Sequence, residues 1–135
     1  MNTSKDIAKK LATLKQEYIK TARQEFQNGT KELFENNLEL KSFGWRQYTP
    51  YFADGDTPEF GVNTDEPNIN DCDGYEVGYE EGSEKLKPLQ DIVAEFLGQF
   101  DSDVYLDIFG DHAEVTITAD KTVVDEYSHD WAKSQ

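Results

Sequence analysis

The apolar residues in the first quarter of the chain recur at helical spacing over an unusually long stretch. Between residues 4 and 36 they are separated by three, four or seven positions, with Lys, Gln and Glu among them. An unbroken helix over 4–36 would be about 50 Å long, which exceeds the width of a domain of this size. The stripe consists of Ile7, Leu11, Leu14, Tyr18, Ala22, Phe26 and Leu33.

The ends of this helix carry their own signals. Ser4 is predicted to cap the N-terminus, with Asp6 in the first turn. Asn28-Gly29 either ends the helix or only weakens it. A helix longer than its domain either lies across its own sheet or pairs with a second copy, so a homodimer through this helix is one of two alternatives.

The rest of the chain predicts an α+β domain. We expect one domain over 1–135, with an antiparallel sheet of four to five strands, the long N-terminal helix and a second helix, in the order α-β-β-α-β-β-(β). The second helix spans 86–100, with Pro88 in its first turn and Leu89, Ile92, Val93, Phe96 and Leu97 packed on the sheet. Strands are expected at 42–48, 59–63, 104–109, 112–118 and 122–127, with tight turns at Gly110-Asp111 and Asp120-Lys121.

Charge is distributed very unevenly. Between Gln47 and Glu84 there are eleven carboxylates and no Lys or Arg. Residues 1–41 carry a net charge of +2 and residues 42–135 carry −17, which sum to −15. From residue 64 to residue 84 no apolar period survives, so this stretch is predicted to be an acidic loop. Such a surface repels nucleic acid and attracts basic proteins.

Several sequence features bear on the compartment. The single cysteine, Cys72, excludes an intrachain disulfide and fits a reducing environment. The N-terminus lacks the apolar run of a secretory signal, and no stretch approaches the roughly 18 apolar residues of a membrane span. We therefore expect a cytoplasmic protein with no membrane partner.

The sequence contains no motif that identifies a catalysed reaction. Asp71 to Gly74 copies the middle of an EF-hand loop, but that register puts Ile69 where the first carboxylate ligand is needed.

His112 beside Asp111 is expected to form a local hydrogen-bonded pair, since nothing indicates a nearby nucleophile. Acidic neighbours should raise the pKa of Cys72. We predict no metal, no cofactor and no catalytic residue, and an enzyme is not indicated.

Five aromatic residues lie within ten positions, from Phe43 to Phe52. On a strand, Phe43, Trp45 and Gln47 would share one face. The aromatic rings either form core or make a recognition surface beside Asp54 and Asp56.

The segment FGWRQYTPYFADGDTPEF, residues 43–60, resembles small acidic proteins encoded by bacteriophages, which carry a Trp-x-Gln-Tyr-Thr-Pro-Tyr-Phe-x-Asp-Gly-Asp stretch. Phe109-Gly110-Asp111-His112 matches a later run of theirs. The resemblance extends from the first helix to that run. It implies a phage context, in which small proteins block host enzymes and some acidic ones imitate DNA, and it assigns no site residues.

These patterns favour a non-enzymatic acidic protein that occupies a basic, nucleic-acid-binding type of site on a host protein, as an inhibitor or DNA mimic. The alternative is a small-molecule or metal-binding protein or enzyme with a pocket between Trp45 and Asp56. The residues expected to bind the basic partner are Asp54, Asp56, Asp65, Glu66, Asp71, Asp73, Glu76, Glu80, Glu81, Trp45, Tyr48 and Tyr51.

Overall fold

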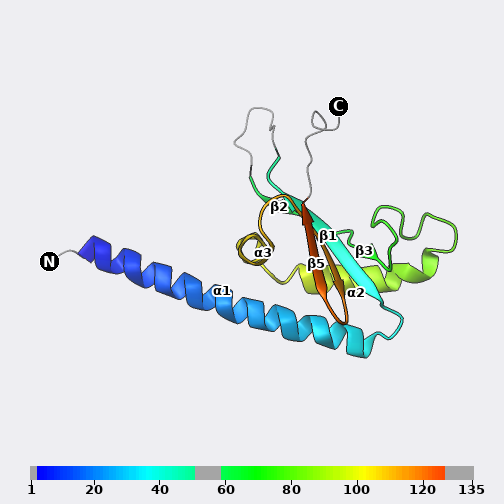
Figure 1. Ribbon diagram of the computed structural model, residues 1–135, viewed down its shortest axis with the longest axis horizontal. Coiled ribbons are helices and arrows are strands. Elements are labelled where there is room, and N and C mark those ends of the chain that lie inside the picture. Colours follow the sequence, from blue (N-terminus) through cyan, green and yellow to red (C-terminus); the bar gives the residue numbers. More distant parts are fainter. Residues whose placement is uncertain (1–2, 51–58, 127–135) are drawn as a thin grey trace.

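The computed structural model describes residues 3–50 and 59–126, which form an α+β fold with one long helix along one side of an antiparallel sheet (Figure 1). The predicted fold class is confirmed. In chain order the elements are α1 (Thr3–Asn36), β1 (Ser42–Tyr48), β2 (Gly61–Val62), β3 (Asn68–Ile69), the 3-10 turn η1 (Glu84–Leu86), α2 (Lys87–Leu97), α3 (Ser102–Phe109), β4 (Ala113–Thr118) and β5 (Thr122–Glu126).

Helix α1 is continuous and its N-terminal half projects beyond the rest of the molecule (Figure 1). Asn28-Gly29 does not end it. A Cβ at Gly29 would lie 2.4 Å from a ring atom of Phe96, so a larger residue here would have to displace that ring. Ser4 lies inside the helix rather than ahead of it, which corrects the predicted cap.

Strand β1 is the centre of the sheet. It pairs with β4 from Ser42↔Thr118 to Gln47↔Ala113, and β4 pairs with β5 across a turn that includes Asp120-Lys121, as predicted. The other edge of β1 is shared by two short strands, β2 near its C-terminal end and β3 near its N-terminal end.

The core lies between the helices and one face of the sheet. The alternation in β1 puts Phe43, Trp45 and Gln47 on this face, and all three are buried. The Gln47 amide donates to the carbonyls of Tyr105 and Gly110 at 3.0 and 2.6 Å and accepts from the Trp45 indole at 2.9 Å. A buried polar group is stable only with such partners, so Gln47 fixes β1 against α3.

The segment predicted as a strand at 104–109 is the helix α3, and that prediction is wrong. Val104 and Tyr105 are buried and Phe109 is half-buried, which is the spacing of one helical face, whereas a strand would have buried Leu106 no less than Val104. Gly110 is therefore the helix C-cap, with φ of 87°, and not the first residue of a hairpin turn.

Helix α2 lies within the predicted range of 86–100 but ends three residues earlier than predicted, at Leu97, with Gly98 as its C-cap. Leu89, Val93 and Leu97 are buried, and Pro88 sits in the first turn. Ile92 is 40% exposed, because the apolar stripe is wider than the contact it makes.

Candidate binding surfaces

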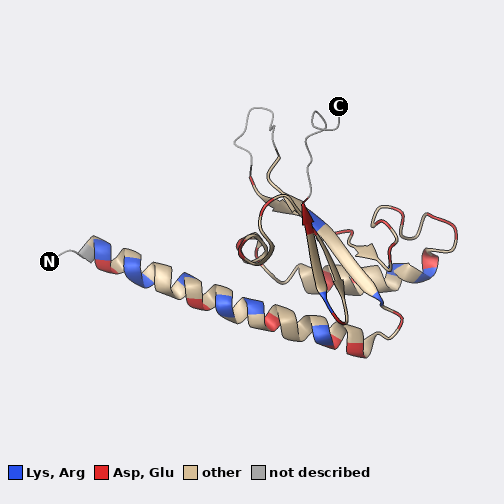
Figure 2. Ribbon diagram, in the orientation of Figure 1, with Lys and Arg blue, Asp and Glu red and all other residues tan. Residues whose placement is uncertain are grey.

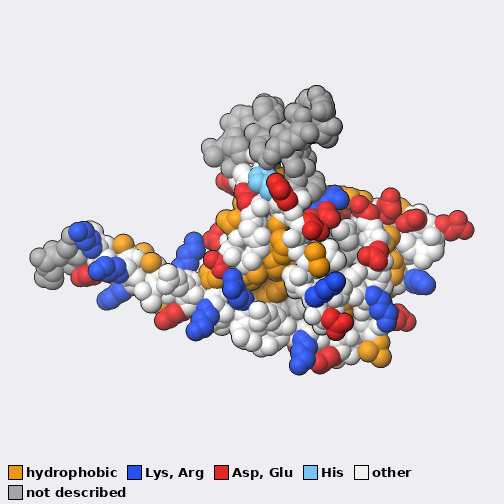
Figure 3. Space-filling view, viewed as in Figure 1, with side chains coloured by type: hydrophobic (Ala, Val, Ile, Leu, Met, Phe, Trp, Pro, Cys, Tyr) orange, Lys and Arg blue, Asp and Glu red, His pale blue; other side chains and the backbone are white. Residues whose placement is uncertain are grey.

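The acidic stretch forms a distinct part of the surface, which we call the acidic lobe and define as residues 59–84. Acidic residues recur along this stretch (Figure 2), and acidic side chains are visible on the surface of this part of the molecule (Figure 3). It holds nine of the eleven carboxylates predicted to form the block, because Asp54 and Asp56 fall outside the described residues. All are exposed except Asp73, which is half-buried: Glu59, Asp65, Glu66, Asp71, Asp73, Glu76, Glu80, Glu81 and Glu84.

Two apolar side chains anchor the acidic lobe. Ile69 is fully buried and Val77 is 2% exposed, and both belong to the main core. Ile69 also sits in β3, opposite Phe43 of β1, so the predicted loop contains a short strand. The apolar periodicity of the sequence could not predict that these two residues are buried, because two isolated apolar residues form no repeating pattern.

Side-chain amides hold the backbone between these anchors. Asn70 accepts from the backbone N–H of Lys41 and Ser42 at 2.6 and 3.1 Å and donates to Glu39 O at 2.9 Å. Gln90 of α2 is buried and donates to the carbonyls of Pro67 and Gly74 at 3.1 and 2.8 Å. The acidic lobe is thus fastened to α2 and to the α1–β1 connection by hydrogen bonds that the sequence pattern did not reveal.

Gly74 and Ser83 also hold the backbone of the acidic lobe in place. A Cβ at Gly74 would lie 1.8 Å from Glu66 O, so no other residue fits without a backbone shift. The buried Ser83 hydroxyl accepts from Gly78 N and donates toward Glu80 O at 2.6 Å. The carboxylates therefore project from an ordered backbone.

Four ion pairs of Lys or Arg with carboxylates lie outside the acidic lobe. They join Lys15 to Asp103, Arg23 to Asp107, Arg46 to Glu114, and Lys87 to Asp91. None of these four pairs includes a carboxylate of the lobe, and residues 59–84 themselves contain no Lys or Arg.

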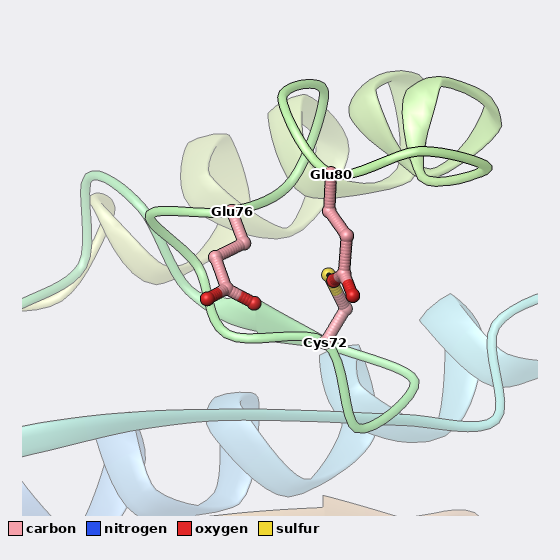
Figure 4. Close-up of side chains that lie close together, drawn as sticks. All are labelled: Cys72, Glu76 and Glu80. Atoms are coloured by element: carbon pink, nitrogen blue, oxygen red, sulfur yellow. Dashed lines mark hydrogen bonds between the residues drawn. The ribbon is translucent and has the colours of Figure 1, made fainter.

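Cys72, Glu76 and Glu80 converge, with their ligand-type atoms within 4.8 Å of one another (Figure 4). The Cys72 thiol donates to Glu80 Oε2 at 3.7 Å. Burial, with Glu80 nearby, raises the pKa of Cys72, as predicted from its acidic neighbours, and the charge of Glu80 raises the pKa of Glu76. The protonated thiol serves as a hydrogen-bond donor to an acid here. Ile69, at the first EF-hand ligand position, points into the core and offers no ligand.

The aromatic segment is divided between core and surface. Trp45 is 2% exposed and packs among core rings, which corresponds to the core alternative for this segment. Tyr48 is half-buried at the end of β1. Tyr51 lies outside the described residues, together with the rest of the predicted pocket as far as Asp56.

Asp111 and His112 form a local structural unit. Asp111 accepts from the Thr49 hydroxyl at 2.7 Å and from the backbone N–H groups of Thr49 and His112 at 2.8 Å each. Partial burial opposes its charge, but these hydrogen bonds outweigh it and lower the pKa of Asp111. The pair thus connects the end of β1 to the start of β4.

An apolar groove that the sequence did not indicate runs between α1 and the β4–β5 hairpin, with a volume of ≈ 800 Å³. Apolar side chains are visible between the helix and the sheet on this face of the molecule (Figure 3). Phe34, Phe109 and Val124 line it, and the buried Thr30 hydroxyl has no hydrogen-bond partner among the described residues.

Comparison with protein-family models, with curated proteins and with solved structures finds no match for this chain. Among the helices of residues 3–50 and 59–126, none combines the length and the apolar character needed to cross a bilayer.

Proposed function

We propose that this protein is a non-enzymatic binding protein whose acidic lobe occupies a basic site on another protein. One observation carries the proposal: nine carboxylates lie on a stretch of chain that contains no Lys or Arg, and its backbone is held by Ile69, Val77 and Gln90. A preorganised surface loses less conformational entropy on binding than a mobile loop does.

Sites that bind nucleic acid are basic because they contact phosphates. The sharper form of the proposal is that the partner is a nucleic-acid-binding protein of a bacterial host, inhibited by DNA mimicry in the cytoplasm. The resemblance of residues 43–60 to phage proteins supports that context. A pocket built on Trp45 loses support because the indole is buried.

The test is capture from bacterial extract with a charge-reversed lobe. Asp73 accepts from Tyr75 N, and Asp71 has a φ of 68°, so changing either residue would disturb the backbone. Glu80 accepts from the Cys72 thiol, so changing it would remove a side-chain contact inside the lobe. The variant instead reverses four exposed carboxylates: Asp65→Lys, Glu66→Lys, Glu81→Lys and Glu84→Lys.

A matched control reverses four exposed carboxylates elsewhere: Glu32→Lys, Glu35→Lys, Glu39→Lys and Glu95→Lys. Both variants change the net charge from −15 to −7, because each reversal adds two charges. We expect the wild type and the control to retain the same basic proteins, and added duplex DNA to release them. The lobe variant should retain none of them.

Equal capture of the basic proteins by both variants would show that binding depends on the net charge of the protein and not on the acidic lobe, which would contradict the proposal. Capture that DNA does not release would leave acidic-lobe binding intact but contradict mimicry. Purified protein that itself retains DNA would contradict the proposal altogether.

A further inference from the structure

The N-terminal part of α1 presents an apolar stripe that its own domain leaves largely exposed, although the Tyr18 hydroxyl is hydrogen-bonded to the N-cap residue of α3. We call residues 4–21 the arm; it projects away from the sheet and carries several basic residues (Figures 1 and 2). Ile7, Leu11, Leu14 and Tyr18 are 57, 61, 60 and 49% exposed, and apolar side chains follow one edge of the projecting helix (Figure 3). A contiguous exposed apolar stripe indicates an interaction surface.

The spacing along the arm differs from that of the rest of α1. The four exposed residues follow each other at four, three and four positions, which is the spacing of a coiled-coil seam. From Tyr18 onward the steps to Ala22 and Phe26 are four each, and these two residues are buried in the protein's own core. The arm therefore carries a short coiled-coil stripe next to a segment already packed.

We propose that the arm pairs with the arm of a second copy in an antiparallel homodimer. In this register Leu11 packs against Leu14 of the other copy, and Ile7 packs against Tyr18. The proposal is independent of the acidic lobe.

The continuity of α1 selects the antiparallel direction. A parallel second helix would follow the stripe toward Ala22 and Phe26, where the protein's own core already covers α1. An antiparallel helix ends there instead, because its residue 4 lies opposite residue 21. The two domains then stand at opposite ends of the paired arms.

Charges beside the stripe select the same direction. Lys10 and Glu17 flank it on one side, and Ala8 and Lys15 flank it on the other. Antiparallel helices bring the same flank together, so Lys10 of each copy faces Glu17 of the other. Parallel helices would place Lys10 opposite Lys15, which is repulsive.

The acidic end of α3 adds to this complementarity. Asp101 accepts from the Tyr18 hydroxyl at 2.8 Å, and Asp103 lies 3.7 Å from the Lys15 ammonium. The N-terminal turns of the second copy, with Lys5 and Lys9, would end beside these carboxylates.

The test is the molar mass of the full chain measured by light scattering over a concentration series. The wild type should approach twice 15.5 kDa with increasing concentration. Leu14→Asp should remain at 15.5 kDa with an unchanged melting temperature, because this side chain lies outside the core. A wild type that stays monomeric at submillimolar concentration, or a Leu14→Asp variant that still dimerises, would overturn the proposal.

A charge swap tests the direction. Lys10→Glu should weaken self-association roughly fivefold to tenfold, because two attractive pairs become repulsive. Lys10→Glu combined with Glu17→Lys should restore it. Strengthening by Lys10→Glu alone would mean parallel pairing and would overturn the antiparallel assignment.

Discussion

Phe26 joins the long helix to the rest of the molecule through contacts with several aromatic rings. From one position on α1 its ring meets five others, with centroids 5.4 to 6.1 Å away. Aromatic rings bury large areas, which lets a chain of 36% hydrophobic content build a core. The five rings belong to Trp45, Phe96, Phe100, Tyr105 and Phe109.

Phe26→Ala should therefore lower the free energy of unfolding by about 3–5 kcal/mol, through lost burial and the cavity left behind. Denaturant unfolding followed by near-UV circular dichroism measures this loss. Leu106→Ala is the control, since Leu106 is 39% exposed and should cost far less. Equal losses for the two variants would mean that the core is not centred on Phe26.

Asp111 adds a pH dependence. Its pKa is lower in the folded protein than in the unfolded chain, because Thr49 and His112 donate hydrogen bonds to the carboxylate. The stabilisation is therefore present above the unfolded pKa and is lost as the pH falls through the folded pKa. Asp111→Asn should destabilise at neutral pH, and the difference from wild type should shrink in acid. A difference independent of pH would contradict this role.

At the scale of elements, whether a helix or a strand was predicted correctly depended on the length and regularity of the apolar pattern within that segment. The helix over 4–36, the strand over 42–48 and the α+β class were predictable because their apolar periods are long or strictly alternating. The eight residues of α3 are too few to separate a strand of Val, Tyr and Ile from a helix. The charge of the acidic lobe was predictable but its ordered backbone was not, since the hydrogen bonds of Asn70 and Gln90 and the close contact at Gly74 leave no periodic pattern in the sequence.

The acidic lobe offers a test at this scale. Gly74→Ala should destabilise the protein by at least about 1–3 kcal/mol, because the methyl group would meet Glu66 O. Hydrogen exchange should show loss of protection spreading through 67–78. Gly61→Ala is the matched control, because its Cβ would meet no atom within 4 Å. Full protection in Gly74→Ala would contradict the close contact.

At the scale of the whole molecule, the net charge differs between the two parts of the chain, with +2 over residues 1–41 and −17 over the rest. The basic residues of 1–41 lie mostly on α1, whereas residues 42–135 carry a net charge of −17 (Figure 2). An interface formed by such a lobe should associate by electrostatic steering, so salt should affect the association rate more than the dissociation rate.

The central claim is that the acidic lobe is the binding surface, and its most direct measurement is the association rate with the captured partner as salt is increased. The Debye length falls from about 10 Å at 0.1 M to about 3 Å at 1 M salt. We predict that the rate for the wild type falls steeply over this range, whereas the variant with four lobe reversals starts slow and changes little. A wild-type rate that is independent of salt, or equal to that of the lobe variant, would contradict the account.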